Sequence, residues 1–261
     1  MTKEMIFAEY GIEYKNGKIF APLFGWIAPL LVNGNSKLGK NVWTFSTLPS
    51  NKVFHVNIGT KENPQYIDIL GTCVCNCQGC YAQTGFYNMP STLKANAIKT
   101  YLVWNELDFV KRAIIAQIKA EKIDLCRIHA SGDFFSVEYV NVWKDICNEC
   151  GTCVFWTYTK NTQAEKAFDS IANCNVVKSI IPNIGMNYGH CDYIMTVYNV
   201  LKASGKSVHI CKCGIDKNQH CNTCKGCSEN EYVLFIEHST SYKAEKDIAY
   251  PTLKEVVENQ H

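Results

Sequence analysis

Four cysteines fall within eight residues, and their spacing limits what this chain can fold into more than any other feature of the sequence. Cys73, Cys77 and Cys80 form a C-x3-C-x2-C motif, with Cys75 between the first two. Three thiolates at these separations can bind three irons of a cuboidal iron–sulfur cluster. One iron then has no protein ligand, and an open coordination position is typical of a working metal site rather than a sealed structural one.

Two other occupants of this loop stay open. A C-x-C-x-C-x2-C run can bind a structural zinc ion, or a cluster held entirely by the protein with Cys75 as the fourth ligand. We favour the open iron–sulfur cluster, because a zinc knuckle needs neither the strand-like segment before the loop nor the matching turn after the next strand.

The cysteine spacing resembles that of the radical S-adenosylmethionine (SAM) enzymes, in which the methionine part of SAM chelates the fourth iron. The Gly-Gly-Glu type turn of that superfamily resembles Ser131–Asp133, at the end of the next strand-like run. The likeness is closest to a phage-encoded branch, the gene product eighty-eight family. It rests on the Cys-Tyr-Ala ending of the loop (Cys80–Ala82), a Ser-Gly-Asp-Phe-Phe turn and a Thr-Tyr-Thr-Lys strand end (Thr157–Lys160).

This resemblance implies a [4Fe-4S] cluster on Cys73, Cys77 and Cys80, with SAM bound beside it. The second motif would offer backbone groups to the methionine ammonium, and Lys160 could meet the methionine carboxylate. The candidate SAM-binding residues are Tyr81, Ser131, Gly132, Asp133, Lys160 and Asn183. No catalytic residue is identified.

A second cysteine group lies in HICKCGIDKNQHCNTCKGC, which spans residues 209–227. The C-x2-C-x2-C step resembles ferredoxin loops, so we expect an auxiliary [4Fe-4S] cluster. Its expected ligands are Cys213, Cys221, Cys224 and Cys227. Zinc is the alternative, and His220 could then replace one thiolate.

The remaining cysteines are expected to be mainly buried, small apolar side chains. They are Cys126, Cys147, Cys150, Cys153, Cys174 and Cys191. Because Cys147, Cys150 and Cys153 repeat the C-x2-C-x2-C spacing, a third metal site is the alternative. We also expect His129 and His209 to be core histidines, and Ser136 rather than Asp133 to cap the following helix.

From residue 65 onward, strand-like and helical patterns alternate. The strand-like runs lie near residues 65–71, 123–131, 152–159, 174–182, 207–212 and 231–238, and the helical runs at 92–120, 137–150, 161–173 and 192–204. Parallel neighbours need crossover connections, so this order predicts an α/β fold, a partial (β/α)6 TIM-like barrel. The radical-SAM resemblance implies the same shape. Sites in such barrels form at the carboxyl ends of the strands.

We expect three regions: a β-rich N-terminal cap over residues 1–60, the barrel over 61–240 with an auxiliary metal-binding loop at 211–227, and a C-terminal tail or helix over 241–261. In the cap, Asn16-Gly17 predicts a tight hairpin.

The composition limits where in the cell this protein can function and which partners it can bind. The chain has 261 residues, 15 cysteines and a net charge of +2, which gives no general attraction to nucleic acid. Its start at Met1-Thr2-Lys3-Glu4 is no signal peptide, and no apolar run is long enough to span a bilayer. Cysteines grouped in C-x2-C steps fit a reducing cytosol with thiolates reserved for metal. We expect a cytoplasmic, oxygen-sensitive protein without a membrane partner.

The sequence thus predicts a radical SAM enzyme that cleaves SAM reductively and starts radical chemistry on an unknown substrate, served by an electron donor such as flavodoxin or ferredoxin. A different class is also open, a zinc- or iron–sulfur-stabilised binding module. In that module, Lys212, Lys217, Lys225 and Tyr232 would contact nucleic acid. A third hypothesis is a regulatory or SAM-depleting protein without a coupled substrate.

Overall fold

The computed structural model describes residues 1–34, 38–74, 77, 80–180, 188–189, 191–212, 216 and 218–236. Four residues singled out above, Cys75, Asn183, Cys213 and Lys217, lie outside these ranges, as does the expected C-terminal tail or helix at 241–261.

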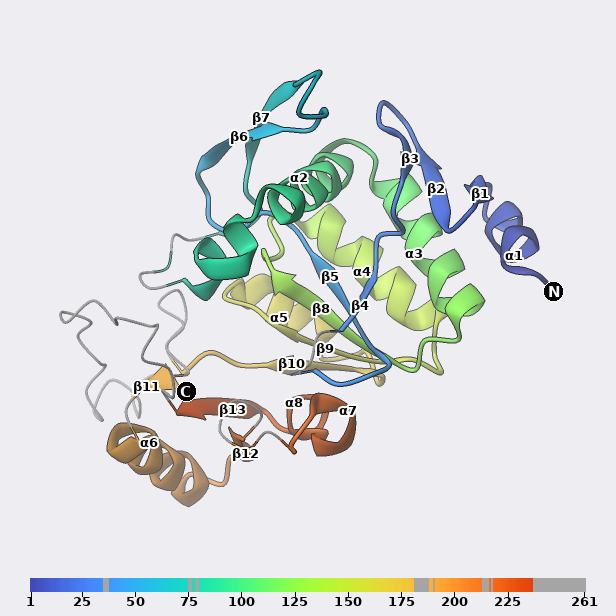
Figure 1. Ribbon diagram of the computed structural model, residues 1–261. Helices are drawn as coiled ribbons and strands as arrows, with labels where there is room; N and C mark the ends of the chain where they lie inside the picture. The colour runs from blue at the N-terminus through green and yellow to red at the C-terminus, as the bar shows by residue number, and fades with distance from the viewer. Residues whose placement is uncertain are drawn as a thin grey trace.

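A five-stranded sheet lies at the centre of the molecule, with the strand order β10-β9-β8-β5-β4 (Figure 1). Its strands are β4 (Val32–Asn33), β5 (Val42–Ser46), β8 (Leu125–Ser131), β9 (Val154–Tyr158) and β10 (Cys174–Val177). The last four run parallel, and β4 pairs with β5 in the antiparallel direction. The expected mixed α/β class is therefore confirmed, while no closed barrel is seen in the described ranges.

The crossover helices are α2 (Pro90–Asn105) and α3 (Leu107–Glu121) between β5 and β8, α4 (Val137–Glu149) between β8 and β9, and α5 (Thr162–Phe168) between β9 and β10. Their apolar faces form the main core with Cys126, Ile128 and Phe155 of the sheet. Ser136 caps α4 as expected, because its side chain accepts a hydrogen bond from the Tyr139 N–H.

The first strand of the parallel sheet is not the segment that the sequence suggested. Residues 65–71 contain β7 (Tyr66–Leu70), which pairs antiparallel with β6 (Val53–Asn57) in a separate hairpin. Its place in the parallel sheet is taken by β5, from the part of the chain expected to form the cap. The burial pattern explains the error: β7 carries Asp68 and two exposed residues, as one-sided antiparallel strands do, whereas β5 is buried or half-buried throughout.

After the hairpin the chain returns to the carboxyl end of β5. The N–H groups of Thr72 and Cys73 donate to the carbonyl oxygens of Leu48 and Ser50, at 3.0 and 3.1 Å. The hairpin is therefore an insertion between β5 and the cysteine loop, and the loop itself starts at the end of a strand of the parallel sheet.

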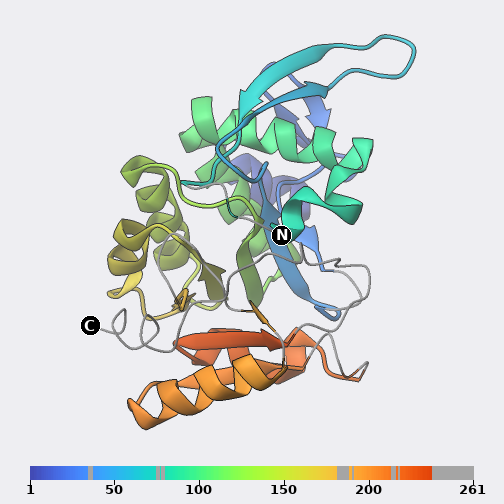
Figure 2. The same cartoon turned by 90° about the vertical axis from the view of Figure 1, so that its left-hand side faces the viewer.

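A second sheet, with the order β11-β13-β12, packs below the first (Figures 1 and 2). It consists of β11 (Tyr188–Gly189), β12 (Val208–Cys211) and β13 (Tyr232–Ile236), all parallel, with α6 (Cys191–Ala203) packed on it. The Lys178 N–H donates to Glu231 O at 2.8 Å, which joins the end of β10 to the start of β13. In a barrel whose strands follow chain order, β12 would be the neighbour of β10. Here β13 is next to β10, so the order of neighbouring strands differs from that expectation.

The N-terminal segment forms α1 (Lys3–Glu9) and a small antiparallel sheet of β1 (Tyr14–Lys15), β2 (Lys18–Ala21) and β3 (Gly25–Ile27). The predicted hairpin is confirmed, since Asn16 and Gly17 both have positive φ, 51° and 75°. None of the helices in the described part of the chain is long and apolar enough to cross a membrane.

One buried amide joins this segment to the main core. The Leu31 N–H donates to Gln117 Oε1, and Gln117 Nε2 donates to Leu31 O, both at 2.8 Å, and both residues are only 2% exposed. We predict that Gln117→Leu lowers the free energy of unfolding by roughly 2–4 kcal/mol, because two buried backbone groups lose their partners. Chemical denaturation measures this loss. The control Lys111→Ala breaks only an exposed ion pair with Asp145 and should cost less than about 1 kcal/mol; equal losses would contradict the assigned role.

Candidate functional site

The carboxyl ends of β5, β8 and β9 meet at one edge of the central sheet, and three sequence motifs lie there. The cysteine loop begins at this edge, Ser131–Asp133 ends β8, and Thr159 and Lys160 follow β9. Parallel strands bring their ends together in this way, and the edge is where ligand sites form in such sheets.

Asp133 joins two of these strand ends. Its carboxylate is 5% exposed and accepts hydrogen bonds from the Thr159 hydroxyl at 2.6 Å and from the backbone N–H groups of Phe134 and Lys160, at 2.7 and 2.9 Å. Burial raises the pKa of this carboxyl group above its ordinary value, and the hydrogen bonds act in the opposite direction. Asp133 therefore fixes the backbone from which the Lys160 side chain extends.

Gly132 occupies a position that no other residue fits. Its φ is +87°, and a Cβ atom here would lie 1.8 Å from Thr47 Oγ1 and 2.6 Å from Thr72 Oγ1. The two hydroxyl groups are 2.7 Å apart, and Thr72 Oγ1 also accepts the Asp133 N–H at 3.1 Å. The end of β5, the start of the cysteine loop and the turn after β8 are thus packed against one another.

The three predicted cluster cysteines lie together beside Lys160. Cys73, Cys77 and Cys80 are half-buried thiols that form no disulfide bond. Burial is the main cause of a raised Cys73 pKa, and Asp133, Cys80 and Cys77 are near enough to add to it. Lys160 Nζ donates to Cys77 Sγ at 2.7 Å. Positive charge from the end of β9 is therefore placed directly at the cysteine loop.

Tyr81 holds the far end of the loop to the sheet. It begins a short 3-10 helix (Tyr81–Gln83), its hydroxyl donates to Ala130 O at 2.5 Å, and Arg127 Nη2 donates to that hydroxyl at 3.0 Å. The Tyr87 hydroxyl donates to the same carbonyl at 3.2 Å. Ser131 is also used within the protein, since its hydroxyl donates to Thr47 O at 2.9 Å. The SAM-binding roles of Tyr81 and Ser131 stay predictions.

A bulge in β8 turns the Ala130 carbonyl toward these tyrosines. Thr44 pairs with Arg127 but Ser46 pairs with Ser131, so β8 contains two more residues than β5 over this stretch. His129, within the bulge, has φ +57° and contacts the Tyr139 hydroxyl through Nε2 at 2.8 Å. It is 2% exposed, so the expected core histidine is confirmed.

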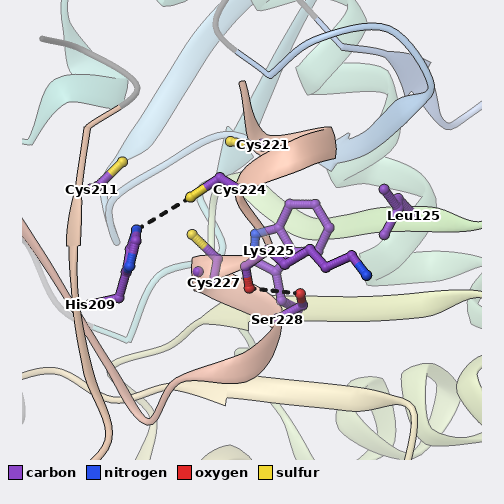
Figure 3. A pocket seen from close by; sticks show the side chains of 10 residues that line it. Leu125, His209, Cys211, Cys221, Cys224, Lys225, Cys227 and Ser228 are labelled. Atoms are coloured by element: carbon purple, nitrogen blue, oxygen red, sulfur yellow. Dashed lines mark hydrogen bonds between the residues drawn. The ribbon is translucent and has the colours of Figure 1, made fainter. Parts of the chain in front are cut away.

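The second cysteine group lines a pocket together with Leu125 and Trp156 of the central sheet, and Figure 3 shows the cysteines of this group and Leu125 around it. Four cysteines and a histidine line it: His209 and Cys211 from β12, Cys221 and Cys224 from α7 (Cys221–Cys224), and Cys227 from α8 (Gly226–Glu229). The interpretation of His209 as a core histidine is wrong, because the ring is half-buried and its Nε2 lies 3.3 Å from Cys224 Sγ.

Cys211 is a site residue that the sequence reasoning did not select. The available signal was the strand period of two, which places His209 and Cys211 on the same face of β12. His220, considered as a zinc ligand, occupies the N-cap position of α7 without a side-chain capping hydrogen bond, and it is not among the residues lining the pocket.

The other cysteines are mostly in the core, as predicted. Cys126, Cys147, Cys150 and Cys153 are at most 4% exposed, and Cys174 is partly buried. Cys191 is the exception: it is exposed, because it begins α6 in the first turn of that helix.

Both cysteine groups offer the donors that iron–sulfur clusters use. None of their described members forms a disulfide bond, and thiolate sulfur is the usual ligand of such clusters. In the described ranges, no three His, Cys, Asp or Glu side chains are grouped so that they could hold a metal ion.

Residues 29–181 match the family model described as Gene product 88. The matched stretch contains the cysteine loop, the turn after β8 and the end of β9, and it stops before the second cysteine group. No radical-SAM family model matches. No curated protein and no solved structure matches the chain.

The packing around Gly132 gives a stability prediction. Gly132→Ala should lower the free energy of unfolding by roughly 2–4 kcal/mol, because backbone strain adds to overlap with a buried threonine. The matched control is Gly205→Ala, where φ is +73° but nothing lies within 4 Å of the added Cβ, so only the strain remains. Thermal or chemical unfolding measures both, and equal losses in the two variants would contradict the close approach.

His129 gives a pH prediction. Burial, and secondarily Arg127, lowers the pKa of His129 from its ordinary value of 6.5 to about 3. Between these values the unfolded chain binds a proton that the folded chain does not, so stability falls as pH falls below 6.5. The expected loss from this group between pH 7 and pH 5 is about 2 kcal/mol.

Denaturation at several pH values tests this, with His129→Asn as the variant because Asn tolerates positive φ. The variant should show a smaller loss between pH 7 and pH 5 than the wild type, whereas His55→Asn, at an exposed histidine, should keep the wild-type loss. An unchanged slope in His129→Asn would be incompatible with a neutral buried histidine.

Proposed function

Since the chain belongs to the Gene product 88 family, and the matched region holds all three motifs at the strand ends, we propose that this protein is a radical SAM enzyme. Cys73, Cys77 and Cys80 would hold a [4Fe-4S] cluster, with SAM on the remaining iron and a substrate that is unknown. The observation that carries the proposal is the grouping of these three thiols with Lys160 and the Gly132 turn at the carboxyl ends of parallel strands.

The donor set supports a cluster with an open position. Three thiolates from one loop would bind three irons, and the bound cluster would supply the electron that breaks a carbon–sulfur bond of SAM. Lys160 supports the proposal in a second way, because an ammonium group 2.7 Å from Cys77 Sγ stabilises negative charge at the loop. In the proposed complex, the same ammonium group would also contact the methionine carboxylate of SAM.

The remaining residues position these groups. Asp133 holds the backbone of Lys160, and Thr72 fixes the start of the loop against the Gly132 turn. Because Gly132 has no side chain, the backbone after β8 can approach the loop closely, which is what binding the methionine ammonium through backbone groups requires. Tyr81 and Tyr87 fasten the loop's far end to Ala130.

The finer fold and the partners belong to the same proposal. Four parallel strands with crossover helices, continued by the parallel strands β13 and β12 beyond β10, support an open barrel-like sheet of the expected (β/α)6 kind. An electron donor such as flavodoxin or ferredoxin would reduce the cluster, and a reducing, oxygen-poor cytoplasm would preserve it.

The test is reductive SAM cleavage. The protein is reconstituted without oxygen, reduced with dithionite and given SAM, and 5′-deoxyadenosine and methylthioadenosine are measured by mass spectrometry. We expect one of these products from the wild type and none above background from Cys80→Ala. The control Cys191→Ala removes an exposed cysteine outside both groups and should leave product formation unchanged.

The product identifies the carbon–sulfur bond of SAM that breaks, because 5′-deoxyadenosine and methylthioadenosine come from the cleavage of different bonds. If neither forms while iron and sulfide are bound at full occupancy, radical chemistry is wrong, and a colourless protein containing zinc would favour the metal-stabilised binding module instead.

A further inference from the structure

We propose that the pocket between the two sheets is a second iron–sulfur site, and that Cys211, Cys221, Cys224 and Cys227 are its four ligands. This goes beyond the proposed function, because it requires neither SAM nor the first cysteine loop. It also replaces the fourth ligand expected from the sequence, Cys213, by Cys211.

The first argument is the convergence of four thiols from three separate elements. Cys211 ends β12, while Cys221, Cys224 and Cys227 come from the two short helices before β13, and all four line one pocket with His209 (Figure 3). Figure 3 places the sulfur atoms at one end of the pocket. Four thiols that form no disulfide bond are a complete ligand set for a closed cluster.

The second argument is that the surrounding residues hold the sulfur atoms by hydrogen bonds. The Tyr158 hydroxyl lies 2.7 Å from Cys227 Sγ, and His209 Nε2 lies 3.3 Å from Cys224 Sγ. If these sulfurs are thiolates, the hydroxyl and the imidazole N–H are the donors. Groups of this kind orient the ligands of a metal site and set the reduction potential of a cluster.

The third argument is the close packing that brings His209 to the loop. A Cβ atom on Gly226 would lie 2.3 Å from His209 Cδ2, so the His209 ring can pack this closely against the loop only because residue 226 is glycine. On the opposite side, Asn175 Nδ2 donates to the carbonyl oxygens of Cys227 and Asn230 at 2.7 and 2.8 Å. The loop is thus fixed from both β12 and β10.

The cysteine spacing favours a cluster over one zinc ion. Tetrahedral zinc with bonds of about 2.3 Å holds its sulfur ligands only about 3.8 Å apart. A cuboidal cluster separates its ligands more widely, because each thiolate binds a different corner. The C-x2-C-x2-C spacing of Cys221, Cys224 and Cys227 suits that arrangement.

The experiment isolates this site by removing the first one. A chain with Cys73→Ala, Cys77→Ala and Cys80→Ala is reconstituted anaerobically, and iron, sulfide and zinc are measured per chain, with electron paramagnetic resonance after reduction. We expect about four irons and four sulfides per chain. Adding Cys211→Ala should reduce the iron at least twofold, whereas adding Cys213→Ala, the matched control, should leave it unchanged.

A second variant tests the site without removing a ligand. Tyr158→Phe in the same background should keep its iron but shift the midpoint potential to a more negative value, because a hydrogen bond to a ligating sulfur stabilises the reduced cluster. A tyrosine that only fills space would leave the potential unchanged. If the triple variant does not fold, the wild-type chain serves, and Cys211→Ala should then lower iron from about eight to about four per chain.

Three results would overturn the proposal: one zinc per chain and no sulfide, no metal at all, or loss of iron with Cys213→Ala but not with Cys211→Ala. None of them bears on SAM cleavage at the first loop. The failure of this proposal and the failure of the proposed function are therefore distinguishable.

Discussion

The candidate site depends on the hydrogen bonds of one buried carboxylate. Burying Asp133 is unfavourable unless its oxygens are satisfied, and three donors from the turn after β8 and the end of β9 satisfy them. These hydrogen bonds fix the backbone of Lys160. The Asp133 N–H also donates to the Thr72 hydroxyl, and Thr72 is the residue directly before Cys73, where the cysteine loop begins. Without this carboxylate, the ends of the two central strands would lose their common anchor.

The sequence predicted those parts of the molecule whose signals are local. The runs at 123–131 and 152–159 became β8 and β9, Ser136 caps its helix, and Gly132 stands where a close approach requires glycine. Recognising a strand in the sequence did not reveal which strand it pairs with. Residues 65–71 contain a strand as expected, but it pairs with β6 in a hairpin, and β5 instead pairs with β8 in the parallel sheet. Which strands pair is decided by tertiary contacts that a single pattern does not contain.

In the candidate sites too, the sequence predicted the features that depend on local spacing and missed those that depend on tertiary contacts. Motif spacing identified the loop cysteines and the turn, because those residues are close in the chain. Spacing did not identify the contact between Tyr158 and Cys227, or the role of Cys211, since these depend on how the second sheet packs against the first. Arg127 links the two regions: its guanidinium lies 4.9 Å from the Tyr158 ring centre and donates to Tyr81 at 3.0 Å. One cation thus contacts both cysteine regions through tyrosines.

One part of the structure around the central sheet lies inside the stretch that matches the family model, and another part lies outside it. The helices α3 to α5 belong to the matched stretch, whereas the elements over Trp156 and beside β10 come after it. A chain cut after β10 would lose the residues of the second cysteine group that line a pocket with Trp156, a large aromatic ring that is now 3% exposed. Because uncovered apolar surface favours association, we expect a relative that shares only the matched stretch to cover this ring with another structure or with a partner.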